Sequence, residues 1–236
     1  MNELTPISRA VALSEVPDAP DTLEFRSMAL DARTEVYRSG SGLLLLHDAA
    51  GGMLGAVGEV KPAHGRQLFE PRRLTCELLA DRRAYEVLSQ EYSFERAKIL
   101  RLVCDWRSPG NYIKGLVIRL LEPSDALAHL PTELANEIES QRFEGEIIAG
   151  FIGNKAVSFA YAGSTTETLA DVSIDTLAEY RRTGIGRAVV SALIDRIVAG
   201  GKAPVWGAVV DNVASLALAA SIGFTRPAGE LFVHEA

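Results

Sequence analysis

The stretch Tyr180-Arg181-Arg182-Thr183-Gly184-Ile185-Gly186-Arg187-Ala188 lies between two segments of different periodicity. Residues 170–176 alternate and are rich in β-branched side chains, which predicts a strand. Residues 189–197 carry aliphatic side chains at helical spacing before Gly200-Gly201, which predicts a helix. The glycines therefore lie where a strand turns into a helix. Free backbone N–H groups and the positive end of a helix dipole bind anions at such a place, so we predict a pyrophosphate site there.

Two other phosphate-binding motifs fit this turn less well. A Walker loop has a longer glycine pattern that ends in Lys-Ser/Thr, and no lysine occupies this turn. A dinucleotide-binding fingerprint has a third glycine, at the position that Val189 takes here. Taken alone, Arg-x-x-Gly-x-Gly is also compatible with an ordinary helix start. The residues that follow decide between these readings.

A second strand and a second helix follow the turn. Residues 204–210 predict the strand, Asn212 is suited to cap the helix, and Gly223 is suited to end it. The order is strand, Arg-x-x-Gly-x-Gly, helix, strand, Asn-x-x-Ser-x-x-Leu-Ala-x-x-x-Gly-Phe and strand. Over residues 116–236 this order resembles the GNAT superfamily of acyl-CoA-dependent N-acetyltransferases.

The resemblance implies an α+β fold with a mixed α/β sheet, a GNAT-like acyl-CoA N-acyltransferase fold. We expect it in a domain of residues 111–236, with the element order β-α-α-β-β-β-α-β-α-β. The patterning predicts the same elements, with strands at 116–121, 146–151, 156–162 and 230–234, and helices that start at Pro123 and, reaching about Arg142, at Pro131. The turn-forming residues 107–111 are the predicted boundary.

Residues 1–110 are expected to form a smaller mixed α/β N-terminal domain of unknown role. The patterns predict a poorly ordered or extended arm at 1–21, a strand at 22–28, a hairpin at 42–58, a helix from Leu78 to Tyr92 and a strand at 99–104. The hairpins at 42–58 and 146–162 are similar in length and hydrophobicity. The N-terminal domain is therefore read as a degenerate GNAT-like half, without a cofactor turn of its own.

The resemblance implies acetyl-CoA as the cofactor and places its parts on this chain. The main chain near Thr176 and Leu177 would hold the pantetheine arm and polarise the thioester carbonyl. Turn amides from Arg182 to Arg187 would hold the pyrophosphate, and the start of the last helix would lie beside the pantetheine arm. The expected cofactor-binding residues are Thr176, Leu177, Arg181, Arg182, Thr183, Gly184, Ile185, Gly186, Arg187, Asn212 and Ser215. No metal site is expected. A glutamate at position 186 is expected to abolish acetyl-CoA binding while the chain still folds.

The attacking amine must lose a proton, and the strand before the turn offers two carboxylates for this step. Asp171, Ser173 and Asp175 share one strand face by their spacing of two. We expect Asp171 to be the base and Asp175 to line the cleft, although the same face is also compatible with plain solvent exposure. Glu167 and Ser158 are further cleft candidates.

The sequence departs from the family at the expected proton donor. Many members carry a tyrosine four residues before the Gly-Phe pair, and Ala219 stands at that position here. The thiolate then leaves unaided, takes its proton from water, or takes it from a donor in the N-terminal half such as Tyr112.

Composition limits the partners. A net charge of −7 argues against a general nucleic-acid or anionic-membrane binder and is compatible with an amine substrate. The run of four leucines at residues 43–46 is far too short to span a bilayer, and the start of the chain has no signal-peptide pattern. The two cysteines, Cys76 and Cys104, form no disulfide framework and are read as buried thiols in the cytoplasm.

Three functions remain open at this stage. The first is an N-acetyltransferase that moves an acetyl group to a primary amine of a small molecule by direct attack in a ternary complex. The second is a non-catalytic acetyl-CoA-binding sensor module, and the third is a protein or peptide N-acetyltransferase. A homodimer is among the expected assemblies. Acceptor loops vary freely on one fold, so the sequence does not name the acceptor.

Overall fold

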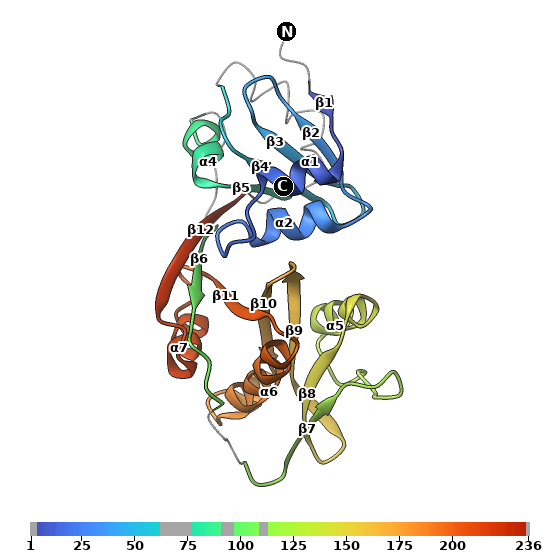
Figure 1. Cartoon of the computed structure of the whole chain (residues 1–236). Coiled ribbons are helices and arrows are strands. Elements are labelled where there is room, and N and C mark those ends of the chain that lie inside the picture. The colour runs from blue at the N-terminus through green and yellow to red at the C-terminus, as the bar shows by residue number, and fades with distance from the viewer. Residues whose placement is uncertain (1–3, 62–76, 91–96, 109–112, 235–236) are drawn as a thin grey trace. The chain divides into compact units, whose positions relative to one another are not determined.

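The computed structural model describes residues 4–61, 77–90, 97–108 and 113–234. The chain forms two compact units (Figure 1). The first unit comprises Met1–Leu102, Ala208–Val213 and Pro227–Ala236, and the second comprises Val103–Gly207 and Ala214–Arg226. The domain boundary predicted at residues 107–111 falls partly outside the described residues and stays a prediction.

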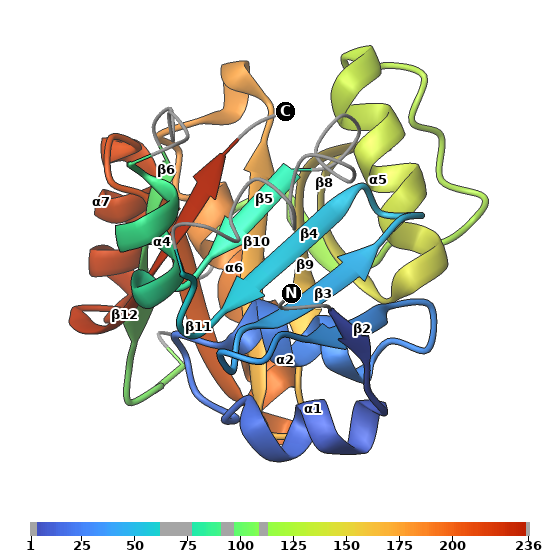
Figure 2. The same cartoon turned by 90° about the horizontal axis from the view of Figure 1, so that it is seen from above.

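The first unit is built on a sheet of strand order β1-β2-β3-β4-β5-β12-β6. Its elements are β1 (Thr5–Pro6), α1 (Arg9–Glu15), α2 (Leu23–Leu30), β2 (Glu35–Arg38), β3 (Leu44–Asp48), β4 (Met53–Val57), β5 (Glu77–Ala80), α4 (Arg82–Leu88), β6 (Ala97–Val103) and β12 (Arg226–His234). Strands β3 and β4 form the predicted hairpin and lie side by side in Figure 2. Strands β4 and β5 run parallel, whereas β5 and β12 run antiparallel.

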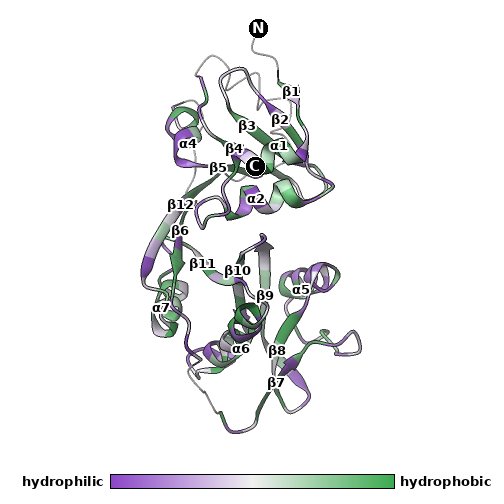
Figure 3. Ribbon diagram, viewed as in Figure 1, coloured by the Kyte–Doolittle hydropathy of each residue, from purple (hydrophilic) through white to green (hydrophobic). Residues whose placement is uncertain are grey.

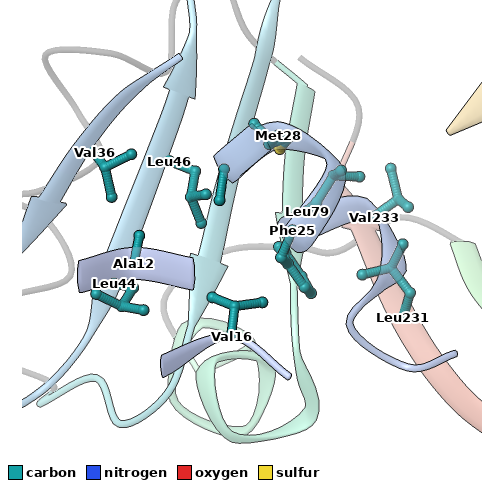
Figure 4. Packing of buried hydrophobic residues seen from close by; sticks show 11 residues of the cluster. Ala12, Val16, Phe25, Met28, Val36, Leu44, Leu46, Leu79, Leu231 and Val233 are labelled. Carbon is teal, nitrogen blue, oxygen red and sulfur yellow. The ribbon is translucent and has the colours of Figure 1, made fainter. Parts of the chain in front are cut away.

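The apolar run Leu43–Leu46 is buried throughout because this sheet is covered on both faces. Leu44 and Leu46 belong to a cluster with α1 and α2, where Phe25 is fully buried (Figure 4). Leu43 and Leu45 point the other way and belong to a cluster with α4. A Cβ at Gly55 would lie 3.1 Å from the Phe25 ring, so glycine at this position lets α2 approach β4 closely.

Three predictions for the first unit are wrong. Residues 1–21 include a helix, α1. Ser8 caps its N-terminus, because the Ser8 side chain accepts a hydrogen bond from the N–H of Val11. The predicted strand at 22–28 is instead the helix α2. The buried apolar side chains of this helix lie on the side that faces the sheet. The predicted helix from Leu78 is a strand, β5, followed by α4. Asp81 separates them by accepting a hydrogen bond from Ala84 N, and the predicted end of that helix lies outside the described residues.

The second unit has a sheet of order β11-β10-β9-β8-β7. Its elements are β7 (Leu116–Leu120), α5 (Thr132–Glu144), β8 (Ile147–Ile152), β9 (Lys155–Thr165), β10 (Leu169–Thr176), a short 3-10 helix η1 (Ala178–Tyr180), α6 (Ile185–Ala199), β11 (Ala203–Val209) and α7 (Val213–Ile222). Its pairs are antiparallel except β10 with β11, which is parallel. Figure 3 shows the hydrophobic colour of β8, which is buried over most of its length.

Helices α6 and α5 lie on opposite faces of this second sheet. A Cβ at Gly150 would lie 2.5 Å from Val189 Cγ2, so α6 packs closely on the face of β8 that carries Gly150. On the other face, the Tyr161 hydroxyl of β9 reaches the Glu137 carboxylate of α5. The predicted mixed α/β sheet is therefore confirmed.

One predicted helix of the second unit is absent within residues 113–234. Residues 123–125 form a turn, because the Asp125 carboxylate accepts hydrogen bonds from Glu122 N at 2.7 Å and from the Arg119 guanidinium. The helix predicted from Pro131 and the strands before and after it are confirmed. Among the described residues, none of the helices has the length and apolar character that a bilayer crossing requires.

Candidate functional site

The turn between β10 and α6 has an unusual backbone. Arg182 has φ +62° and is the one non-glycine residue in the left-handed region among the described residues. Gly184, two residues later, has φ +87°, and α6 begins at Ile185. Left-handed residues at a turn let successive N–H groups point into one concavity, which is an arrangement that binds anions.

The N–H groups of residues 182–187 have no hydrogen-bond acceptor in the part of the chain that the structure describes. The hydrogen bonds on either side are made, since Arg181 N donates to Ala178 O and Ala188 N donates to Gly184 O. These unpaired donors lie at the N-terminus of a helix that runs to Ala199, where the helix dipole is positive. The turn is therefore suited to bind phosphate oxygens through its backbone N–H groups.

Gly184 and Gly186 serve different purposes in this turn. Gly184 supplies the left-handed conformation, and a Cβ there would meet only Ile113 Cδ1, at 3.5 Å. At Gly186 a Cβ would lie 2.8 Å from Thr176 Oγ1. That oxygen is 2.8 Å from Ser158 Oγ, which is fully buried. Gly186 thus lets α6 pack against the end of β10.

The side chains of the turn differ in how far they are already engaged. Arg181 Nε donates to Thr176 O at 2.9 Å, and Thr183 Oγ1 donates to Tyr180 O. Arg182 is exposed. Arg187 is half-buried, and its Nε has no hydrogen-bond partner among the described residues. Ile185 is a core residue, so it offers only its main chain to a ligand.

Strands β10 and β11 separate beside the turn. They pair only from Leu169 to Asp171 with Ala203 to Val205, and neither strand pairs with the other beyond that point in the described residues. Leu177 N donates to Val157 O of β9 at 3.0 Å. Because N–H direction alternates along a strand, Thr176 N points away from β9 and toward the opened side. Of the two main-chain donors predicted for the thioester, Thr176 faces the opening and Leu177 is engaged with β9.

The start of α7 holds the remaining predicted cofactor residues. Asn212 directly precedes the helix, and its N–H donates to Val209 O. Ser215 Oγ accepts a hydrogen bond from the buried Trp206 indole at 3.0 Å. Ala219 stands where the resemblance would place a tyrosine, so this position has no hydroxyl, and the alanine is fully buried.

The face of β10 opposite α6 is acidic. A Cβ at Gly163 would lie 3.3 Å from Ser173 Oγ and 3.8 Å from Asp171 Oδ2, which agrees with the predicted sharing of one face. Burial raises the pKa of Asp175, the Glu137 charge raises it further, and the Arg181 charge lowers it.

Other predicted site residues lie apart from this face. Ser158 lies on the α6 side of the sheet, where its hydroxyl donates to Asp175 O at 3.0 Å, so it is a packing residue. Glu167 is exposed in the turn between β9 and β10. Burial raises the pKa of the Cys104 thiol to about 11, and Cys76 and Tyr112 lie outside the described residues.

Comparison with known proteins identifies this arrangement. Residues 144–228, which include the turn and the separated strands, match the family model described as GNAT acetyltransferase. Over these residues the chain is similar to the GNAT acetyltransferase family. A comparison with curated proteins found no match.

Solved structures share the GNAT fold over nearly the whole chain. A GCN5-related N-acetyltransferase-like protein from Streptococcus suis is 16% identical, with a TM-score of 0.65 over 96% of this chain and 100% of that one. A GCN5-related N-acetyltransferase from Kribbella flavida is 14% identical, with a TM-score of 0.60 over 96% and 94%. A tandem GNAT protein from the clavulanic acid biosynthesis pathway is 12% identical, with a TM-score of 0.64 over 99% and 97%. These likenesses show the fold.

Two residues beside the acidic face of β10 carry little signal in the sequence pattern. Tyr161 of β9 lies directly opposite Ser173, and its hydroxyl donates to Glu137 of α5. Both residues fall within elements that were predicted, but no local pattern links positions that are 24 residues apart. The one available signal was that Tyr161 carries the only hydroxyl-bearing aromatic ring in the mostly apolar strand 156–162.

Proposed function

We propose that this protein is an acetyl-CoA-dependent N-acetyltransferase that acts on a primary amine of a small molecule. The GNAT family match and fold support the class of reaction. The observation that carries the proposal is the row of N–H groups at residues 182–187, which have no acceptor among the described residues. A phosphate-bearing ligand is what satisfies such a row.

The chain offers a donor set that fits coenzyme A. The amides of residues 182–187 would hold the pyrophosphate, and the side chains of Arg182 and Arg187 would add positive charge. Thr176 N would bind the pantetheine arm on the opened side of β10, and Asn212 and Ser215 would border that arm. The bound molecule supplies an activated acetyl group. The protein aligns it, keeps water away and handles the proton of the amine.

The acidic face of β10 is suited to the acceptor. Ammonium groups are attracted to carboxylates, and the amine must lose a proton before it attacks. Asp171 and Asp175 are the two carboxylates of that face, and Asp175 has the raised pKa that favours proton uptake. Residues 111–236 would form the acetyltransferase domain, and residues 1–110 a GNAT-like half without a cofactor turn.

Calorimetry and a thiol-release assay with an amine library test this function. Arg182→Glu should weaken acetyl-CoA binding by about tenfold or more, because a negative charge then faces the phosphates. Arg83→Glu makes the same change on an exposed residue of the first unit and should leave binding unchanged. Binding without thiol release would favour a sensor, and release only with peptides would favour a protein acetyltransferase. Absence of acetyl-CoA binding in the unaltered protein would overturn the proposal.

A further inference from the structure

Strand register brings a tyrosine and an aspartate together on the face of the second sheet that α5 covers. Tyr161 pairs with Ser173, and Asp175 is two residues further along the same face of β10. Such a diagonal neighbour is about 7 Å away at the backbone, within reach of an aromatic side chain. The residue directly opposite Asp175 is Phe159, which is fully buried. On β9, Asp175 therefore has the apolar Phe159 directly opposite and Tyr161 as its diagonal neighbour.

The Tyr161 hydroxyl also holds a second carboxylate, that of Glu137 on α5. Tyr161 is 5% exposed, and its hydroxyl donates to Glu137 Oε1. Burial raises the pKa of Tyr161, and the hydrogen bond to Glu137 raises it further, so the hydroxyl keeps its proton. Glu137 itself is exposed on α5. A buried donor thus holds one oxygen of an otherwise exposed carboxylate.

The same part of β10 borders the opening between β10 and β11. Pairing between these strands ends at Asp171, so the residues that follow, up to Thr176, have a free main-chain edge on that side. A thioester at that edge would lie beside the strand that carries Asp175. The charged and titratable side chains that face Asp175 among the described residues are Glu137 of α5, Tyr161 of β9, Asp171 of β10 and Arg181 after η1.

We propose that Glu137, held by the Tyr161 hydroxyl, is a positioning residue for Asp175, and that Asp175 accepts the proton of the attacking amine. This inference rests on the proposed function. The ammonium group gives one proton to Asp175, its nitrogen forms the bond to the acetyl carbon, and the carbon–sulfur bond breaks with its electron pair on sulfur. The second proton of the nitrogen moves to the thiolate, and Asp175 releases its proton to water.

The negative charge of Glu137 has a defined task in this scheme. It disfavours the ionised form of Asp175 and so raises the proton affinity of the base. Arg181 acts in the opposite direction. The acid limb of the pH–rate profile would report the balance of these two charges, provided that Asp175 is the base.

The test is a set of full-length variants, with kcat/KM measured against pH and the Asp carboxyl carbons followed by NMR. Glu137→Gln should move the titration of Asp175 and the acid limb of kcat/KM downward by about 0.5 pH unit or more, because a like charge is removed. Tyr161→Phe should move both in the same direction by less. The double variant should match Glu137→Gln alone, because Tyr161 acts through Glu137.

Glu139→Gln is the matched control. It makes the same change on the same helix, at an exposed residue that pairs with Arg142. It should move neither quantity, and all variants should keep the acetyl-CoA affinity of the unaltered protein. An Asp175 titration that Glu137→Gln leaves in place would overturn the inference, whether or not the protein turns over. If the unaltered protein neither binds acetyl-CoA nor turns over, that result would instead count against the proposed function.

Discussion

Gly186 and Thr176 lie against each other where β10 ends and α6 begins, because Thr176 Oγ1 occupies the space 2.8 Å from where a Cβ at Gly186 would lie. The Thr176 hydroxyl cannot move away freely, since it lies 2.8 Å from the buried Ser158 hydroxyl. From the sequence, a glutamate at position 186 is expected to abolish acetyl-CoA binding while the chain still folds. That expectation stays a prediction, but the contact adds a cost in stability, because any side chain at this position must first displace Thr176.

Gly186→Ala should destabilise the protein by about 1–3 kcal/mol, because one methyl group overpacks the contact with Thr176. Urea denaturation measures the change. Gly145→Ala is the matched control, since a Cβ at Gly145 has no neighbour within 4 Å and the backbone there is extended. A double variant with Thr176→Ala should recover part of the loss. Equal stability of Gly186→Ala and the unaltered protein would mean that the helix and strand are not in contact here.

Arg182→Gly should change stability and binding in opposite directions. Glycine adopts the left-handed conformation of this residue freely, so the free energy of unfolding should rise by about 0.5–1 kcal/mol. Loss of the guanidinium should weaken acetyl-CoA binding several-fold, and more at low salt. Arg182→Lys keeps the charge and should retain most of the affinity without the gain in stability. Thermal unfolding and calorimetry on the same samples separate the two effects.

Asp175→Asn should lower kcat by about 10²–10⁴-fold and leave acetyl-CoA affinity intact, because it removes the proton acceptor without touching the turn. Asp171→Asn should have the smaller effect. The pKa of Asp175 is raised on folding, so its ionised form destabilises the folded state above that pKa, and this cost disappears as the pH falls below the unfolded value of about 3.9. Asp175→Asn should therefore raise the melting temperature at pH 7 but not at pH 3. A larger loss of kcat in Asp171→Asn would restore Asp171 as the base.

Arg119→Lys should raise the pKa of Asp125. The Arg119 guanidinium donates two hydrogen bonds to this carboxylate, and these bonds lower the pKa of Asp125 to about 2. The stabilisation is complete above the unfolded value of about 3.9 and is lost as the pH falls through about 2. Lysine cannot form the paired contact, so the pKa of Asp125 that NMR titration measures should rise toward its unfolded value. Titration that stays near 2 would mean that the Glu122 N–H contributes more than the arginine does.

The second unit was predictable because its signals are local. The turn at Gly153, the strand–glycine–helix stretch and the spacing of Asp171 with Asp175 each depend on neighbours a few residues apart. Confirmed strand positions then fixed which side chains share a face. The resemblance to GNAT proteins added the placement of the cofactor, which the residues alone did not supply.

The first unit and the surroundings of Asp175 were less predictable for a physical reason. Leu78 and Leu79 fit a helical period as well as a buried strand, and only the parallel pairing with β4 makes them a strand. The left-handed conformation of Arg182 has no local signal, since arginine rarely adopts it. Tyr161 and Glu137 meet only after α5 has docked on the sheet, so nothing short-range marks them.

Beyond Asp171 and Val205, β10 and β11 no longer pair, so β10 has a main-chain edge there without a neighbouring strand on that side. Amide hydrogens of β10 that point toward β9 are hydrogen-bonded to that strand, while the amide hydrogen of Thr176 points toward the side where pairing with β11 has ended. It should exchange with deuterium as fast as a loop amide in the free protein and slow sharply once acetyl-CoA is added. With acetyl-CoA bound as proposed, the ligand would take the place of a missing strand and would complete the sheet that the chain leaves unfinished.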